Sequence, residues 1–478
     1  MKDLYLRPRQ SWLRRLFKTG RRRTSRIKAP TSGLMRDSVS IPRLAHRRPL
    51  RHVQWVVIVL LPWLFAALLW PANPDPQGYA EKLTPGLDAA ALHTTISPLF
   101  ARLQFPTNLQ LTTRYGTTEA HIYYNFDPIL QSRIDDLLTR YKPDYAAVVA
   151  MDAVTGHILA MASYQRDAQD DTNLALQSGY PAASLFKIIT ASAAIEAGLV
   201  NADTPVTYNG RSTTLYRKQV LRPRNNRWTR RLSLKRAFSE SVNTVFARLG
   251  LLTVGAEKLK KMASRYGFGE TLAGDFLVPQ SPIKSDLDSD WSVAELASGF
   301  NRETRISPLH AALLSATIAN DGKAMAPQVI NTITSASGTL LYSARPQEIQ
   351  QVISAKTARE LRKMMQETIR RGTARQWFRR FRKKTLKGLE VGGKTGSLIG
   401  FSPRGSTDWF TGYGILGQDR IAIAAVTVNR KKWTVKSSYL VRQLLQAHFS
   451  NKAKPVVKDT TTMTGADPVL PVRHRSTS

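Results

Sequence analysis

SLFKIITASAAIEAGLV, residues 184–200, begins with a serine and a lysine three positions apart and continues as an almost wholly apolar run. Its small and aliphatic residues predict a buried helix. Residues at i and i+3 share a helix face, so the Lys187 ammonium group would lie beside the Ser184 hydroxyl. A lysine desolvated in an apolar, cation-rich pocket loses its proton near neutral pH and can activate a serine. The stretch therefore predicts Ser184 as a nucleophile and Lys187 as its base.

A Ser-x-x-Lys pair is by itself a weak motif. The same spacing occurs at 25–28 and at 281–284, where a solvated surface pair is the expected structure. A second element, the triplet SVN at 241–243, follows at a predicted junction between two helices. An N-cap is the structural alternative for Asn243, because asparagine is favoured there.

The third element is a glycine-rich strand that ends in Lys-Thr-Gly. In GLEVGGKTGS, residues 388–397, the glycines Gly392, Gly393 and Gly396 would let a substrate backbone approach closely. As a sheet edge, Lys394–Ser397 could pair with a peptide strand. The order of the three elements, on a helix, a helical junction and a strand, carries more weight than any one of them.

Ser-x-x-Lys, Ser-x-Asn and Lys-Thr-Gly in this order are the signature of β-lactamases and penicillin-binding proteins. Over residues 125–449 the chain resembles the penicillin-binding transpeptidase family. AVVAMDAVTGHILAMAS at 147–163 resembles the family's opening hairpin, DWFTGYG at 408–414 a core strand, and NFDPILQ at 125–131 the strand that enters the domain. The resemblance implies an α/β, serine β-lactamase-like fold: an antiparallel sheet flanked by helices, with an all-helical subdomain.

The resemblance also assigns catalytic roles. Ser184 would attack the carbonyl of a D-Ala-D-Ala stem peptide, and Lys187 would accept its proton. Ser241 and Lys394 would pass a proton to the departing D-Ala nitrogen. The acyl-enzyme would then react with an amine of a second stem peptide or with water, and β-lactams would acylate the same serine.

Substrate-binding roles follow from the same likeness. Asn243 would hold a substrate amide, and the hydroxyl groups of Thr395 and Ser397, beside Gly396, would bind the terminal carboxylate together with Lys394. The backbone N–H groups of the nucleophile and of Ser397 would form the oxyanion hole.

Local patterns predict the elements around these motifs. A helix is expected at 128–141, where apolar residues recur at helical spacing, and two strands with a DAVTG turn at 145–163. A mostly helical stretch is expected from 182 to about 318. Three more strands are expected at 389–397, 408–416 and 420–429, and a closing helix at 437–449.

The N-terminal part predicts a membrane anchor. Residues 1–52 contain 16 lysines and arginines against two acids, and 53–71 carry no charge at all. Under the positive-inside rule the basic tail stays cytoplasmic and the rest is exported, which indicates a single-pass protein of the bacterial inner (cytoplasmic) membrane. The expected order is tail 1–52, signal anchor 53–71, linker and lead-in 72–144, transpeptidase domain 145–450 and disordered tail 451–478.

The amino-acid composition limits which binding partners and which kinds of catalysis are expected. The 478 residues carry a formal charge of +36 and include no cysteine, which excludes disulfides and thiolate chemistry. The eight histidines show no metal-ligand spacing, so no metal and no cofactor is expected. Nucleic acid is not expected as a partner, because most of the chain would lie outside the cytoplasm.

Several functional alternatives stay open at this point. A D,D-carboxypeptidase or endopeptidase uses the same acyl-enzyme, and a non-catalytic penicillin-binding receptor or assembly factor keeps the same fold. Only 75 residues, 72–146, separate the predicted anchor from the first strand of the domain, too few for a glycosyltransferase domain, so a separate glycosyltransferase is an expected partner. The basic runs 217–236 and 370–387 fit either solvated loops or contacts with anionic lipid, wall polymer or an acidic partner.

Overall fold

The computed structural model describes residues 87–452, except 114–115, 168–170, 384–386 and 402. Contacts divide the chain into residues 1–74 and 75–478, and every described residue belongs to the second unit. The predicted basic tail, the predicted membrane anchor and almost all of the predicted C-terminal tail lie outside the described residues. In the described part of the chain, we find no helix that combines the length and the apolar character needed to cross a bilayer.

A five-stranded antiparallel sheet, in the order β15-β16-β17-β3-β4, forms the centre of the fold. Its strands are β3 (Tyr145–Asp152), β4 (Ile158–Gln165), β15 (Glu390–Phe401), β16 (Arg404–Leu416) and β17 (Asp419–Asn429). Strand β17 pairs with β3, so the sheet is assembled from segments far apart in the sequence. The predicted strands are confirmed, and β15 is longer than expected. The DAVTG turn is also confirmed, because Asp152 Oδ1 accepts hydrogen bonds from the N–H groups of Val154 and Thr155.

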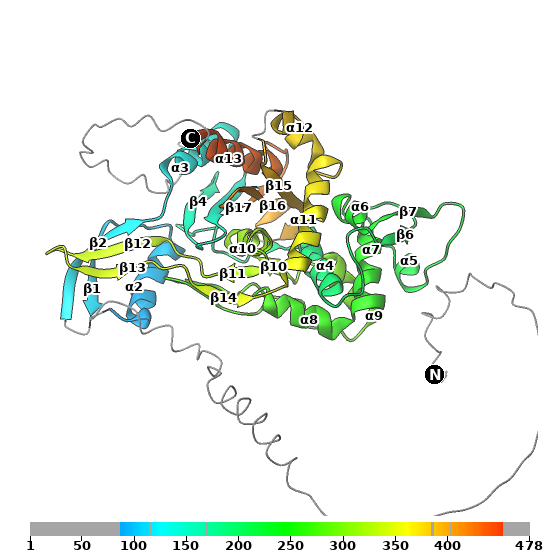
Figure 1. Ribbon diagram of the computed structural model, residues 1–478, viewed down its shortest axis with the longest axis horizontal. Helices are drawn as coiled ribbons and strands as arrows, with labels where there is room; N and C mark the ends of the chain where they lie inside the picture. The colour runs from blue at the N-terminus through cyan, green and yellow to red at the C-terminus, as the bar shows by residue number, and fades with distance from the viewer. Residues whose placement is uncertain (1–86, 114–115, 168–170, 384–386, 402, 453–478) are drawn as a thin grey trace, which may run out of the picture. The chain divides into compact units, whose positions relative to one another are not determined.

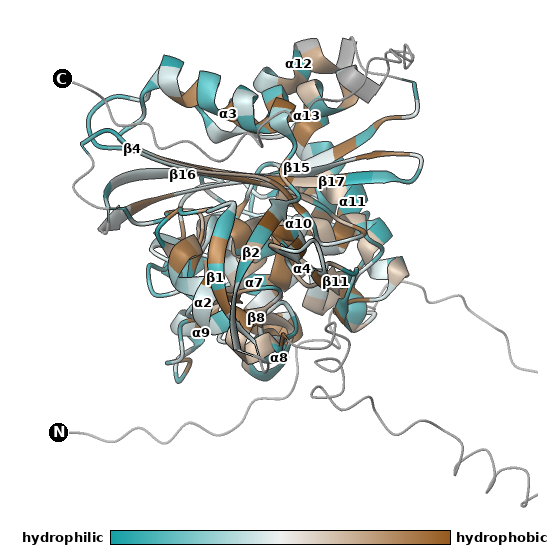
Figure 2. Cartoon of the chain, turned by 90° about the vertical axis from the view of Figure 1, so that its left-hand side faces the viewer, coloured by the Kyte–Doolittle hydropathy of each residue, from teal (hydrophilic) through white to brown (hydrophobic). Residues whose placement is uncertain are grey.

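Helices cover both faces of this sheet, as Figures 1 and 2 show. One face carries α3 (Pro128–Tyr141), α12 (Arg375–Lys383) and α13 (Ser437–Lys452); the other carries α4 (Lys187–Glu196), α10 (Pro308–Ala319) and α11 (Ala355–Arg370). Along β17, Ile421 and Ile423 face the first group and Ala422 and Ala424 the second. Because both faces are covered, the strand reads as a continuous apolar run. The predicted helices at 128–141 and 437–449 are confirmed.

The region between β4 and α10 is mainly helical but not all-helical. Its helical elements are η3 (Ala183–Phe186), α4, α5 (Arg217–Leu221), α6 (Leu234–Ser239), α7 (Asn243–Arg248), the π-helical η4 (Leu249–Val254), α8 (Ala256–Arg265) and α9 (Asp290–Ser298). Two antiparallel strand pairs interrupt it: β6 (Pro205–Tyr208) with β7 (Arg230–Ser233), and β8 (Leu272–Ala273) with β9 (Leu277–Val278). The mostly helical stretch predicted from 182 to about 318 is confirmed. The all-helical subdomain implied by the resemblance is not, because the basic run 217–236 contributes strand β7 as well as helix α5.

A second antiparallel sheet, in the order β1-β2-β12-β13, joins the lead-in segment to later residues. It is formed by β1 (Asn108–Thr113), β2 (Gly116–Tyr124), β12 (Ile330–Ser335) and β13 (Leu340–Ser343), with α2 (Ala89–Ala101) nearby in sequence. Two further short pairs are β5 (Tyr180–Pro181) with β10 (Arg305–Ile306), and β11 (Lys323–Met325) with β14 (Glu348–Gln351).

The expectation that residues 125–131 form a strand is wrong. Residues 125–127 are irregular and Pro128 begins α3. Asp127 accepts hydrogen bonds from the N–H groups of Ile129 and Leu130, and proline is pre-organised for the first helical position. This capping starts the helix directly after β2.

Candidate active site

Ser184 lies in a tight turn at the start of a buried helix. It is the second residue of the 3₁₀ turn η3, which leads directly into α4. The preceding Ala183 has a φ of 48°, in the left-handed region, which is strained for a residue with a side chain. Gly299 packs against this turn so closely that a Cβ there would lie 1.8 Å from the Ala183 carbonyl oxygen. The contact with Gly299 therefore fixes the position of the turn. The Ser184 side chain is half-buried and lines a cleft.

Lys187 is fully buried beneath Ser184. Its Nζ atom lies 2.7 Å from Ser184 Oγ, 2.7 Å from Asn243 Oδ1 and 2.5 Å from the Ser298 carbonyl oxygen. Burial, with a smaller contribution from the charge of Lys394, lowers the pKa of Lys187 well below its ordinary value. A neutral amine has two N–H bonds, which suit the two carbonyl oxygens, and one lone pair, which suits the serine proton. The geometry can therefore deprotonate Ser184.

A second serine–lysine pair faces the first across the cleft. Lys394 Nζ lies 2.9 Å from Ser241 Oγ and donates to the Thr395 carbonyl oxygen, also at 2.9 Å. Lys394 has no exposed surface, and burial lowers its pKa to about 7. Ser241 has a φ of 57°, so the loop between α6 and α7 holds it in a strained conformation. This pair can exchange a proton near neutral pH.

Asn243 connects the second motif to the first. It is the first residue of α7, and Val242 occupies the N-cap position without a side-chain cap, so the N-cap alternative for Asn243 is wrong. Its Oδ1 accepts from Lys187, and its Nδ2 donates to the Thr213 carbonyl oxygen at 2.7 Å. One N–H of the amide remains for a ligand.

The third motif lies on a sheet edge, as expected. Strand β15 is the terminal strand of the five-stranded sheet, and Thr395 Oγ1 lies 2.6 Å from Thr373 Oγ1 on the connection between α11 and α12. The cleft has a volume of about 110 Å³. Six of the sequence-predicted residues line it: Ser184, Ser241, Asn243, Thr395, Gly396 and Ser397. The two lysines lie directly beneath them, so the structure brings all eight residues together.

The expectation that the strand glycines serve substrate approach is wrong for two of them. A Cβ on Gly393 would lie 2.2 Å from the Phe410 ring, and one on Gly392 would lie 2.6 Å from the Tyr413 hydroxyl. These glycines make room for aromatic side chains of the neighbouring strand β16. A Cβ on Gly396, which lines the cleft, would lie no closer than 3.3 Å to its nearest neighbour, the Trp409 Cβ.

The Ser-x-x-Lys copy at 281–284 is not the solvated pair that was expected. Ser281 is buried, and its Oγ lies 2.7 Å from His310 Nδ1. The Lys284 Nζ instead donates to Glu303 at 2.6 Å. Because the segment is not helical, the serine and the lysine make separate contacts.

Sequence reasoning missed four residues that contribute to the site. The Ser298 and Thr213 carbonyl oxygens anchor Lys187 and Asn243, and backbone acceptors leave no sequence signal. Thr373 also lines the cleft and was not among the predicted site residues. Gly299 had a usable signal, because a glycine that ends a helix commonly adopts the left-handed conformation found here.

Within the described residues, no group of three or more His, Cys, Asp or Glu side chains could hold a metal ion. The site instead offers a serine beside a buried lysine with a lowered pKa, a second serine–lysine pair and the terminal strand of the sheet. These features define a serine acyl-transfer site in which lysine replaces histidine as the base.

Residues 146–446 match the penicillin-binding protein transpeptidase domain, and the chain belongs to this family. It is 29% identical over 325 residues to the peptidoglycan D,D-transpeptidase PbpA of Mycolicibacterium smegmatis, which corresponds to 59% of this chain and 62% of that protein. The chain thus spans less than two thirds of the length of this curated relative.

Solved structures share the fold. The D,D-transpeptidase domain of a peptidoglycan glycosyltransferase from Eggerthella lenta superposes with a TM-score of 0.59 at 23% identity, covering 74% of this chain and 91% of that domain. The penicillin G acyl-enzyme complex of penicillin-binding protein A from Mycobacterium tuberculosis superposes with a TM-score of 0.55 at 22% identity. The match covers 69% of this chain and 81% of that chain.

Proposed function

We propose that the protein is a peptidoglycan D,D-transpeptidase that crosslinks stem peptides through an acyl-enzyme on Ser184. The observation that carries the proposal is the 2.7 Å contact between the Ser184 hydroxyl and the fully buried amine of Lys187, at the floor of a cleft beside a free strand edge. The family and the relative named D,D-transpeptidase support the same substrate class.

The first half of the reaction forms the acyl-enzyme. Lys187 takes the Ser184 proton as Oγ attacks the carbonyl carbon of the penultimate D-Ala. The backbone N–H groups of Ser184 and Ser397 stabilise the oxyanion. Ser241 and Lys394 relay a proton to the leaving nitrogen, the C–N bond breaks and D-Ala departs.

The second half transfers the acyl group. The substrate strand lies along β15, where Thr395, Gly396 and Ser397, with the charge of Lys394, hold its terminal carboxylate in the first half. Asn243 holds a substrate amide with its remaining N–H. After D-Ala leaves, an amine of a second stem peptide attacks the ester carbon and gives up a proton to the Ser241–Lys394 pair. The C–O bond to Ser184 then breaks, and Ser184 recovers its proton from Lys187. β-Lactams acylate the same serine, which the penicillin G complex of the related fold supports.

The cellular setting is part of the proposal. A signal anchor at 53–71 holds the protein in the inner membrane, with residues 1–52 cytoplasmic and the transpeptidase domain 145–450 outside. The charge asymmetry of the N-terminal sequence supports this orientation. A separate glycosyltransferase supplies the glycan strands.

Mass spectrometry after incubation with penicillin G tests the acyl-enzyme. We expect one penicilloyl group on the peptide that contains Ser184, and none in Ser184→Ala. Ser281→Ala is the matched control, because it removes the serine of the other described Ser-x-x-Lys copy and should leave labelling intact. Absence of any adduct on the wild-type protein contradicts the proposal.

Turnover distinguishes the remaining alternatives. A stem pentapeptide is incubated with and without an amine acceptor. A crosslinked product indicates a transpeptidase, whereas release of D-Ala with hydrolysis alone indicates a carboxypeptidase. Stoichiometric labelling without turnover of either kind indicates a penicillin-binding receptor.

A further inference from the structure

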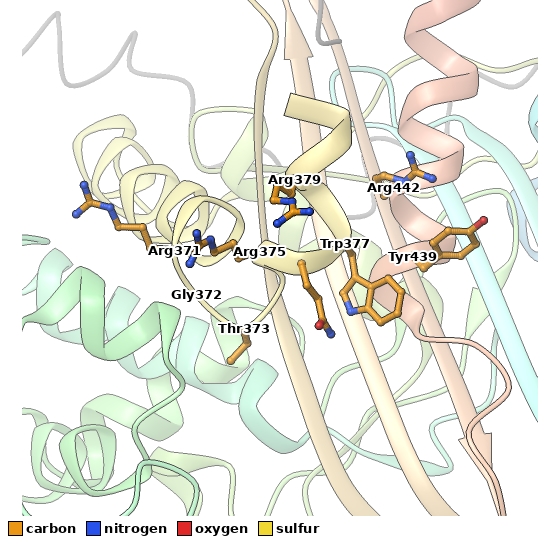
Figure 3. A pocket seen from close by; sticks show the side chains of 9 residues that line it. Arg371, Gly372, Thr373, Arg375, Trp377, Arg379, Tyr439 and Arg442 are labelled. Atoms are coloured by element: carbon orange, nitrogen blue, oxygen red, sulfur yellow. The ribbon is translucent and has the colours of Figure 1, made fainter. Parts of the chain in front are cut away.

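A second, larger cavity lies beside the cleft. It has a volume of about 920 Å³ and lies among the end of α11, helix α12 and helix α13. Figure 3 shows the residues that line it. Four of them are arginines, and none is acidic: Arg371, Arg375, Arg379 and Arg442. The cavity therefore concentrates positive charge at one edge of the active site.

These charges lack matching acids. Arg375 and Arg379 are exposed and lie four residues apart on one face of α12, an arrangement that destabilises a helix unless an anion lies between them. In the ion pairs of the described residues, only Arg371 of the four has a carboxylate, Glu367, at 3.9 Å. Arg442 packs over the Tyr439 ring at 5.3 Å, and its buried Nε has no hydrogen-bond acceptor in the described chain.

The cavity adjoins the catalytic cleft through one residue. Thr373 lines both spaces, and its hydroxyl contacts Thr395 on β15. The neighbouring Gly372 packs so tightly on α6 that a Cβ would lie 2.4 Å from the Ser239 carbonyl oxygen. This connection is therefore fixed in place, and a ligand that begins in the cleft can continue past Thr373 into the cavity.

The lining fits a peptide with carboxylates. Guanidinium groups bind carboxylates through paired hydrogen bonds, and the rings of Trp377 and Tyr439 supply apolar walls for the rest of a chain. The carboxylate of the donor peptide already has a place in the cleft, at Lys394 and its neighbours. The terminal carboxylate of the donor therefore does not need the cavity in the first half of the reaction.

We propose that this arginine cavity binds the carboxylates of the acceptor stem peptide and directs its amine to the acyl-enzyme. The inference rests on the proposed transpeptidase function and adds a site for the second substrate. It predicts that the enzyme selects acidic acceptors over neutral ones of the same length.

The test compares two synthetic peptide amines, one with two free carboxylates and one with both amidated. Transfer of the acyl group to each is measured in the wild type and in Arg375→Glu/Arg379→Glu. The matched control is Lys356→Glu/Arg359→Glu, the same charge change at exposed positions of α11 outside the cavity.

We expect the cavity variant to lose roughly tenfold or more in transfer to the dicarboxylate amine, since each lost charged hydrogen bond weakens binding by about that factor. Transfer to the diamide, acylation by penicillin and the control variant should be unchanged. Equal losses for both amines, or no loss, would overturn the proposal.

Equilibrium binding separates this proposal from the proposed function. Calorimetry measures the dicarboxylate amine binding to the unacylated full-length protein. Binding that depends on Arg375 and Arg379 supports the site even where no transfer is detected, in which case the transpeptidase proposal alone fails. Unchanged peptide binding, with weakened binding to phosphatidylglycerol vesicles, overturns the proposal in favour of a lipid-facing surface.

Discussion

The Oδ1 atom of Asn243 lies 2.7 Å from the Nζ atom of Lys187, although 56 positions separate the two residues in the chain. The second motif thus contacts the base of the first motif as well as facing the cleft. A neutral amide at this position accepts a hydrogen bond without adding charge. It therefore orients the lysine and leaves its lowered pKa intact.

Asn243→Asp tests this relationship with an almost isosteric change. A carboxylate beside Lys187 favours the ammonium form and raises the pKa of Lys187, which lowers the fraction of neutral amine available as the base at neutral pH. Acylation by a fluorescent penicillin should fall by roughly 10- to 1000-fold at pH 7 and recover as the pH rises. Asn226→Asp, the same change in an exposed loop, should leave the pH profile unchanged. A loss that is independent of pH would contradict this explanation.

The burial of Lys394 should reduce stability at neutral pH. Its folded pKa of about 7 lies below its ordinary value of 10.5, so between these values the unfolded chain binds more protons and the unfolding free energy rises with pH. Lys394→Met removes this cost. We expect the variant to be more stable than the wild type by roughly 1–4 kcal/mol at pH 7, by analogy with other buried charges that were replaced by apolar groups.

Urea denaturation at pH 7 and pH 10 measures this difference. The stability gap should shrink at the higher pH, while penicillin acylation is impaired at both. A variant that is less stable than the wild type at pH 7 would show that Lys394 contributes more through its hydrogen bonds than it costs through burial. A gap that widens with pH would show that the pKa of Lys394 is not lowered in the folded protein.

The burial of Asp275 makes the unfolding free energy depend on pH in the direction opposite to that expected for Lys394. Burial raises its pKa from 3.8 to about 7, and the carboxylate accepts a hydrogen bond from the Ile330 N–H in the second sheet. Between pH 4 and 7 the native state binds more protons, so the unfolding free energy falls as the pH rises. Asp275→Asn keeps an acceptor for Ile330 without the charge. The substitution should raise the unfolding free energy by about 1–4 kcal/mol at pH 8 and leave it unchanged at pH 4.

Thermal or urea unfolding at the two pH values checks the Asp275 prediction. Asp136→Asn, which changes an exposed carboxylate with a side-chain exposure of 67%, serves as the control and should show no such difference. Equal effects of the Asp275 change at pH 4 and pH 8 would mean that its charge is not the destabilising feature.

Local patterns were sufficient to predict much of the central fold. The β-branched run of β17, the capped helix α3 and the i, i+3 spacing of Ser184 and Lys187 depend on neighbouring residues only. The strand edge of Lys394–Ser397 was also predicted, because the glycine-rich strand and the order of the motifs pointed to it. For the strand β17, the helix α3 and the Ser184–Lys187 spacing, the information lies within one segment.

Features that depend on distant partners were not predictable. The pairing of β2 with β12 joins segments about which periodicity says nothing, and it makes the lead-in segment part of a second sheet. Gly393 is required by Phe410 on the neighbouring strand. Ser281, which has a lysine three positions later as Ser184 does, contacts His310 and not that lysine. Tertiary contacts decide these roles.

Gly299 and Gly198 offer a matched pair of substitutions. Their φ angles are 69° and 68°, yet a Cβ on Gly299 would meet the Ala183 carbonyl oxygen at 1.8 Å, whereas one on Gly198 would have no neighbour within 4 Å. Gly198→Ala should lose about 1 kcal/mol of unfolding free energy from its backbone conformation alone and acylate normally. Gly299→Ala should lose about 2–4 kcal/mol, because the Ala183–Ser184 turn must also move.

The displaced turn carries the nucleophile, so Gly299→Ala should acylate with penicillin at least roughly tenfold more slowly, since small misplacements of reacting groups reduce rates by such factors. Rates are measured on folded protein at a temperature well below the transition of the weaker variant. If both variants acylate equally fast, the close approach of Gly299 supports the stability of the turn but does not position Ser184. A slower Gly299→Ala beside an unaffected Gly198→Ala would assign the effect to the contact and not to the backbone angle.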